Sequence, residues 1–169
     1  MNVVGKFEYI SKEMVEKTLS QENLNQDLEG YRTQLFDLPR RATKGSAGYD
    51  VRSPFAFVLK AGETIKLPLG FKVKIEEGWC LKFYPRSGLG TKYKIRLSNT
   101  VGIGDSDYYN NSGNEGQYFI FLENHGDKDL SISFNDKICQ CIFEQYGITV
   151  DDIPVSESRV GGFGSTGTK

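Results

Sequence analysis

The sequence has few of the residues that build metal centres and disulfide frameworks. Its 169 residues include three cysteines and a single histidine, His125. Cys80, Cys139 and Cys141 form no CxxC pair, and an odd number of cysteines cannot all pair within one chain. We therefore expect no zinc site, and we expect core thiols that stay reduced, as in a reducing compartment.

Long apolar runs and a strong charge imbalance are also absent. No apolar run reaches the roughly 20 residues that a membrane span needs. The N-terminal stretch MNVVGKFEYI has no basic segment followed by an apolar core, so we expect no signal peptide. A net charge of −1 creates no global field toward nucleic acid or membranes. These features favour a cytoplasmic protein that binds neither membrane nor nucleic acid directly.

Glycine and aromatic residues are plentiful. The 19 glycines and 12% aromatic content suit many short strands joined by tight turns, and the length favours one domain, 1–169. The stretch FAFVLKAGETIKLPLGFKVKI reads as three strands with breaks at Ala61-Gly62 and at Pro68–Gly70. Further strands are expected in NVVGKFEYI, GWCLKFYP, QYFIFLEN, DLSISF and KICQCIFEQY. The sequence thus predicts an all-β, antiparallel sandwich or barrel of jelly-roll type.

Residues 11–29 differ from this pattern. Ser11 has the character of a helix start, and Met14, Val15 and Leu19 form a sparse apolar stripe at helical spacing. We expect this segment to be the only helix in the chain.

The turns between strands carry the candidate chemistry. In YPRSGLGTK, the guanidinium of Arg86, the hydroxyl of Ser87 and exposed backbone N–H groups could cradle an anion. In NTVGIGDSDYYN, Asp105 and Asp107 are two residues apart and would share one side of a strand. An aspartate is ionised at neutral pH and can accept a proton from a bound water. Taken singly, each turn also fits a plain solvated loop.

Five segments in order resemble the five motifs of the trimeric dUTP nucleotidohydrolase (dUTPase) family. They are AGYD, PRSG, NTVGIGDSDY, the strand that carries Gln140, and RVGGFGSTG. The resemblance spans about residues 35–167, and PRSG and the tail are its most specific parts. It implies a β jelly roll, a homotrimer in which three chains build each active site, and dUTP as substrate. It also implies hydrolysis to dUMP and pyrophosphate. This reaction keeps uracil out of DNA, and its product dUMP supplies thymidylate synthesis.

The resemblance also assigns roles to individual residues. Asp105 matches the residue that activates the water attacking the α-phosphorus, and Asp50 matches an acid that touches the water shell of Mg²⁺. The expected cofactor is Mg²⁺, held by substrate phosphates and water. The residues implied for the phosphates are Arg86, Ser87, Gly88, Gln140, Arg159, Ser165 and Thr166. Those implied for uracil and deoxyribose are Asn99, Gly102, Asp107, Tyr108, Phe163 and Gly164. Residues 156–169 are then a flexible lid that orders over substrate.

Four features depart from the family pattern. Gly104 stands where the family has an Ile, which predicts a looser hairpin, and Lys137 replaces an Arg. The loop 109–117 is longer than the family's short turn. Segment 11–34 resembles a helical insertion in dUTPases of low-GC Gram-positive bacteria and their phages. We expect this insertion to be a packing appendage in preference to a partner-binding element.

Two alternatives stay open at the level of sequence. dCTP deaminases share the fold and trimer and need a catalytic Glu, for which Glu115 is the nearby candidate. Some phage dUTPases also bind repressor proteins, and segment 11–34 would then be the contact. The GFGSTG tail and the DSDY hairpin favour dUTP hydrolysis over deamination.

Overall fold

The structure is a computed structural model that describes residues 2–21 and 36–154. The predicted tail residues Arg159, Phe163, Gly164, Ser165 and Thr166 lie outside the described residues, and so does part of the segment 11–34. The strands are β1 Gly5–Tyr9, β2 Arg40–Arg41, β3 Tyr49–Arg52, β4 Phe57–Leu59, β5 Thr64–Pro68, β6 Phe71–Ile75, β7 Trp79–Pro85, β8 Ile95–Leu97, β9 Gly102–Gly104, β10 Phe119–Asn124, β11 Leu130–Ile132 and β12 Lys137–Gln145. The helices are α1 Lys12–Gln21 and α3 Ser87–Tyr93, with a 3-10 turn, η1, over Ser106–Tyr108.

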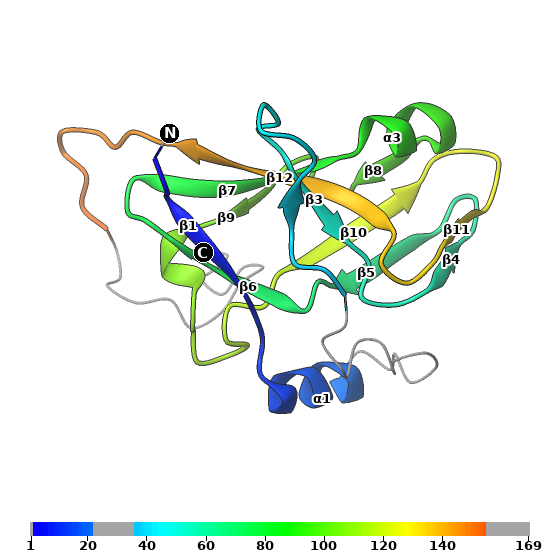
Figure 1. Cartoon of the computed structure of the whole chain (residues 1–169), viewed down its shortest axis with the longest axis horizontal. Helices are drawn as coiled ribbons and strands as arrows, with labels where there is room; N and C mark the ends of the chain where they lie inside the picture. The colour runs from blue at the N-terminus through cyan, green and yellow to red at the C-terminus, as the bar shows by residue number, and fades with distance from the viewer. Residues whose placement is uncertain (1, 22–35, 155–169) are drawn as a thin grey trace.

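The strands form an all-β, jelly-roll-like domain, as predicted (Figure 1). The largest sheet has the order β2-β3-β12-β7-β9, and a second sheet has the order β5-β10-β8. Two further pairs, β1-β6 and β11-β4, complete the described part. Every paired strand runs antiparallel to its neighbour.

Period-two patterning explains why these stretches become strands. In β10 the side chains of Ile120 and Leu122 are buried while those between them are partly exposed. In β6, Phe71, Val73 and Ile75 point to the core in the same way. The predicted break at Ala61-Gly62 lies between β4 and β5, where Gly62 has a φ of 81° that favours glycine.

Helix α1 begins where the sequence predicts. Met14 N donates to Ser11 Oγ at 3.1 Å, which makes Ser11 the N-cap residue. Val15 and Leu19 are buried in the main core, and each apolar side chain buried there stabilises the fold by about 1.5–3 kcal/mol. The described part of segment 11–34 therefore packs as part of the domain. No helix of the described residues is long and apolar enough to cross a bilayer.

The expectation of a single helix is wrong, because α3 forms directly after β7. Gly90 N donates to Arg86 O at 3.0 Å, and Lys94 ends the helix in a left-handed conformation. Gly88 and Gly90 have low helix propensity, which hides this short helix from a reading of the sequence. Figure 1 shows α1 and α3 at opposite edges of the molecule.

Candidate active site

The residues predicted for the phosphate side meet around Asp50. Gln140 of β12 pairs with Asp50 of β3 on one side and with Tyr84 of β7 on the other. Arg86 Nε lies 3.2 Å from Asp50 Oδ1, and Gln140 Nε2 donates to Pro85 O at 3.1 Å. Strand pairing therefore brings three segments that are far apart in sequence into one polar cluster.

Lys137 belongs to this cluster, although the sequence reading noted it only as a departure. Its Nζ lies 2.7 Å from Asp50 Oδ2, so the carboxylate of Asp50 bridges Lys137 and Arg86. The register of β12 against β3 is irregular between Lys137 and Cys139, which places the lysine opposite Arg52. The sequence did contain a signal for Lys137 as a site residue. Lys137 lies three residues before Gln140, on a strand that was already a candidate for phosphate binding.

Ser87 and Gly88 are exposed in the first turn of α3, directly after Arg86. They lie in a helix and not in the open turn that the sequence indicated. The glycine of AGYD has a clear structural reason, since a Cβ at Gly48 would lie 2.8 Å from Gln140 Oε1. Glycine lets the strand approach Gln140 closely.

Asp105 and Asp107 do not share a strand face, which corrects the sequence expectation. Strand β9 ends at Gly104, and Tyr108 N donates to Asp105 O at 3.2 Å to close the 3-10 turn. Asp105 keeps an extended backbone at the start of that turn. Gly104 pairs with Leu81, which places Asp105 next to the start of β7.

The residues predicted for the base and sugar surround the same hairpin. A Cβ at Gly102 would lie 3.3 Å from Phe83 Cβ and 3.6 Å from Asn99 Nδ2, so Asn99 lies beside Gly102. Asp107 is exposed, whereas Tyr108 is buried against Tyr118 with ring centroids 5.1 Å apart. The contact of Tyr108 with a deoxyribose stays a prediction.

Gly104 does not leave the hairpin loosely packed, contrary to our expectation. A Cβ at this position would lie 2.5 Å from Tyr118 Cε1. The ring of Tyr118 therefore fills the space that a larger residue at position 104 would use. The sequence could not show this, because the two positions meet only in the fold.

The two groups of candidate residues lie at opposite ends of β7. Gly104, just before Asp105, pairs with Leu81 near the start of the strand, whereas Arg86 directly follows its end. Leu81 and Arg86 are five residue steps apart along the chain, and a rise of about 3.3 Å per residue makes this about 17 Å. A general base must lie within hydrogen-bond reach of the water it activates. One chain by itself therefore does not bring Asp105 to the Arg86 cluster.

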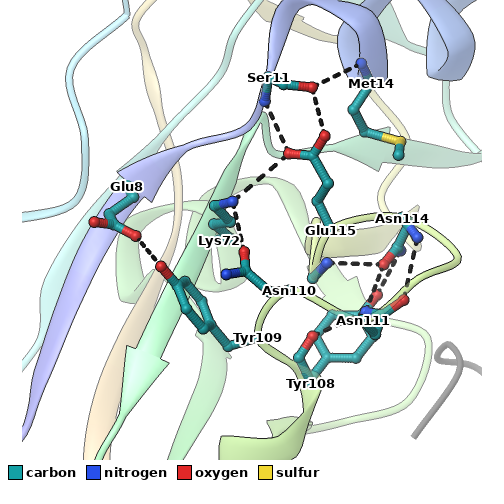
Figure 2. A network of polar contacts seen from close by, with 11 residues as sticks. Glu8, Ser11, Met14, Lys72, Tyr108, Tyr109, Asn110, Asn111, Asn114 and Glu115 are labelled. Carbon is teal, nitrogen blue, oxygen red and sulfur yellow. Dashed lines mark hydrogen bonds and ion pairs between the residues drawn. The ribbon is translucent and has the colours of Figure 1, made fainter.

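Glu115, the candidate for a deaminase glutamate, has a structural role. Its carboxylate accepts from Ser11 N at 3.0 Å and from Ser11 Oγ at 2.5 Å, and Lys72 Nζ lies 3.6 Å away (Figure 2). Burial, the largest effect, raises the pKa of Glu115, but the Ser11 hydrogen bonds and the Lys72 charge outweigh it. The net pKa is below its ordinary value. Glu115 thus holds the start of α1 as a carboxylate.

The described residues contain no group of three or more His, Cys, Asp or Glu side chains that could hold a metal ion. Mg²⁺ usually keeps several waters and binds through one or two carboxylates together with substrate phosphates. Asp50, next to two cations that could bind phosphate, is the donor that fits.

A cavity of about 710 Å³ lies elsewhere, between the N-terminal residues and the turn before β3. It is lined by Arg41, Lys44, Tyr49, Trp79 and Phe143 among others. Ala47 and Tyr49 of the AGYD motif line this cavity, but none of the residues predicted for catalysis or substrate binding does.

Known proteins resemble this chain in sequence over most of its length. A family model described as dUTPase matches residues 34–167. The deoxyuridine 5'-triphosphate nucleotidohydrolase of Lactococcus lactis subsp. lactis is 36% identical over 138 residues, which cover 81% of this chain and 92% of that protein. The corresponding protein of Tolumonas auensis is 41% identical over 140 residues, covering 78% and 88%.

Solved structures show the same similarity. The dUTPase from Streptococcus mutans has a TM-score of 0.65 and 27% identity, over 85% of this chain and 97% of that one. The dUTPase from phage phi11 of S. aureus, described with a species-specific insert, has a TM-score of 0.63 over 94% and 100%. At 18% identity the phage protein shows likeness of fold alone. On the family match and these identities, the chain belongs to the dUTPase family.

Proposed function

We propose that this protein hydrolyses dUTP to dUMP and pyrophosphate, in the cytoplasm, at sites shared between copies of a homotrimer. The observation that supports the shared site is that Gly104, just before Asp105, pairs with Leu81 near the start of β7, whereas Arg86 follows the end of that strand. Five residue steps at about 3.3 Å each separate these two positions of the strand by about 17 Å. Because both groups are implied to act on one triphosphate, the Asp105 of one copy must face the Arg86 cluster of another. The three free thiols suit a reducing compartment.

The chemistry follows from the charges of the two groups. Asp105 accepts a proton from a water, and the water oxygen forms a bond to the α-phosphorus. The bond from that phosphorus to the oxygen bridging to the β-phosphorus breaks, and pyrophosphate leaves. Phosphoryl transfer is mainly positioning and charge neutralisation, which Arg86, Ser87, Gly88 and Gln140 would supply.

Asp50 would exchange partners when substrate arrives. Without phosphates its carboxylate is neutralised by Arg86 and Lys137. A triphosphate would draw both cations toward its oxygens, which would free the Asp50 carboxylate to help hold the accompanying ion. Mg²⁺, when bound, supplies further neutralisation of the phosphate charge. A mutant of the dUTPase from phage phi11 of S. aureus is described as coordinating a structural Mg(II) ion.

Asn99, Gly102, Asp107 and Tyr108 would receive uracil and deoxyribose at the hairpin. The tail would complete the site, with Arg159, Ser165 and Thr166 on phosphates and with Phe163 and Gly164 at the base. A repressor-type partner for segment 11–34 also stays a proposal. Its described part packs into the core, which supports the packing role, and a partner could reach only its exposed face.

The shared site is tested by complementation between two inactive variants. Asp105→Asn and Arg86→Ala chains are purified separately, mixed in denaturant and refolded together. A mixed trimer contains some sites with both wild-type residues, so pyrophosphate release should return to an appreciable fraction of the wild-type rate. Each variant refolded alone is the control. Recovery no greater than the sum of the two controls would refute the shared site.

The reaction itself is tested by the products. We expect pyrophosphate from dUTP in the presence of Mg²⁺, little from dTTP, dCTP or UTP, and a lower rate when Mg²⁺ is removed. Ammonia released from dCTP without pyrophosphate would establish a deaminase instead.

A further inference from the structure

The two segments that depart from the family pattern contact each other. Helix α1 and the loop 109–117 meet at three points along the helix. Ser11 donates to Glu115, Lys17 Nζ donates to Gly113 O at 3.2 Å, and Thr18 Oγ1 donates to Gln117 Oε1 at 2.7 Å. Thr18 and Gln117 are both buried, so their hydrogen bond is shielded from water. The helix and the loop therefore behave as one packed unit.

The same loop holds Tyr108 from three directions. The hydroxyl of Tyr108 donates to Gln117 O at 2.8 Å and accepts from Asn114 Nδ2 at 2.7 Å. Asn111 Nδ2 donates to Tyr108 O at 2.8 Å, as the network in Figure 2 shows. Gln117 thus links α1 to Tyr108, because its side chain binds Thr18 and its backbone carbonyl binds the tyrosine hydroxyl.

The loop backbone adopts conformations that need outside support. Asn110 and Glu115 have φ values of 57° and 58°, in the left-handed region, which Asn tolerates and which costs a residue such as Glu roughly 1–2 kcal/mol. Lys72 Nζ donates to Asn110 Oδ1 at 2.6 Å and lies 3.6 Å from Glu115 Oε2, so one lysine contacts both left-handed positions. At Gly116 a Cβ would lie 2.6 Å from Tyr108 O, so loop and turn are in close contact.

We propose that α1 positions Tyr108 for the family reaction, with Thr18 and Ser11 as its positioning residues. The inference rests on the proposed function, because Tyr108 matters to catalysis only if the turn after Asp105 receives the deoxyribose. Tyr108 N is bonded to Asp105 O, so a shift of the tyrosine also moves the turn that begins with the proposed base. Thr18 and Ser11 touch no substrate and act through Gln117 and Glu115.

The test removes one hydroxyl in the buried contact. Thr18→Val keeps the shape of the side chain and loses the hydrogen bond to Gln117, whereas Thr18→Ser keeps the hydroxyl. Glu13→Gln, on the exposed face of α1, is the matched control. Steady-state kinetics with dUTP and UTP give kcat/KM for each nucleotide. We expect Thr18→Val to lower the dUTP-to-UTP ratio of kcat/KM at least threefold, and Thr18→Ser and Glu13→Gln to keep it. A ratio unchanged in Thr18→Val, with only a lower Tm, would overturn the proposal.

A second measurement does not depend on enzymatic activity. Amide hydrogen exchange over residues 105–118 should become faster in Thr18→Val than in wild type, and should not change in Glu13→Gln. If wild type releases no pyrophosphate but exchange still responds, the proposed function fails and the coupling stands. Unchanged exchange refutes the coupling whatever the activity.

Ser11→Ala provides an independent variant in case Thr18→Val does not fold. Ser11 is only partly buried, and its hydroxyl is one of the two Ser11 groups that hold Glu115. We expect the same loss of selectivity and the same faster exchange, each smaller than in Thr18→Val, because the backbone N–H of Ser11 still donates. A Ser11→Ala protein with wild-type selectivity and wild-type exchange would count against the positioning role.

Discussion

The ring of Tyr118 occupies the space that a side chain at Gly104 would need. Tyr118 also packs against Tyr108, with ring centroids 5.1 Å apart, and against Phe83 at 5.2 Å. The absence of a side chain at Gly104 therefore leaves room for the ring of Tyr118, and this pair of residues fills the core beneath the proposed catalytic turn. The compensation predicts how variants at the two positions combine.

Gly104→Ile should destabilise the fold by about 1–3 kcal/mol, because overpacking a well-filled core costs that much. Tyr118→Ala should also destabilise, since it leaves a cavity. The double variant should be more stable than the sum of the single effects predicts, because the isoleucine then enters the vacated space. Urea denaturation of all four proteins checks this, and additive losses would show that the two residues do not share one space.

Asp105→Asn should keep binding of dUTP and lose turnover by about a thousandfold or more, because general-base catalysis contributes roughly 10²–10⁴. Asp127→Asn, an exposed position in another loop, is the control. Pyrophosphate release measures turnover, and calorimetry with a non-hydrolysable dUTP analogue measures binding. Turnover within a few-fold of wild type would remove Asp105 from its assigned role.

Glu115 should stabilise the fold at neutral pH and stop doing so in acid. Its pKa in the folded state is below its ordinary value, so the stabilisation is present above the unfolded pKa of about 4.3. It is lost as the pH falls through the folded pKa. Glu115→Gln should thus be less stable than wild type at pH 7, and the difference in Tm should shrink below about pH 4. A difference that stays constant with pH would mean that the charge of Glu115 is not what holds Ser11.

The three thiols should not react in the native protein. Cys139 and Cys141 are fully buried and Cys80 nearly so, and burial raises the pKa of each thiol. Because the thiolate is the reactive form, a chromogenic disulfide reagent at neutral pH should find no fast-reacting thiol in the native protein. It should find three after denaturation. A rapid thiol in the native protein would show that one cysteine is accessible.

Phe163→Ala should weaken the binding of a dUTP analogue by about 1–3 kcal/mol if the ring stacks on uracil. Tail closure is expected to need the triphosphate as well, since one stack does not offset the ordering of the tail. Calorimetry with nucleoside mono- and triphosphates tests both points. A change much smaller than about 1 kcal/mol would exclude the stacking role.

Much of the fold was predictable because strands and turns are local. The break at Ala61-Gly62 falls between β4 and β5, and the break at Pro68–Gly70 begins at the last residue of β5 and ends before β6. Ser11 caps α1 as expected. Helix α3 was not predictable, since its glycines oppose a helix and only the surrounding fold stabilises it. Asp105 and Asp107 were placed on a strand because three alternating residues do not reveal where a strand ends and a 3-10 turn begins.

The candidate site was predictable as a list of residues and not as an arrangement. Asp50, Arg86 and Gln140 were all named from the sequence, but their meeting depends on strand register. Lys137 was noted only as a departure, and its contact with Asp50 depends on the irregular register at the start of β12. Thr18 and Gln117 gave no signal, because a buried pair that is 99 residues apart leaves no pattern in the sequence.

The sequence by itself determined the family, the strand pattern and the identity of the chemical groups, because these are encoded in residue types and short spacings. Only the tertiary structure decided which groups meet. It placed Asp105 and Arg86 near opposite ends of β7. It also brought Glu115 into a hydrogen bond with Ser11 at the start of α1. It also let Tyr118 fill the space at Gly104. The physical reason is that strand register and core packing join residues far apart in sequence, and local propensity carries no record of those contacts.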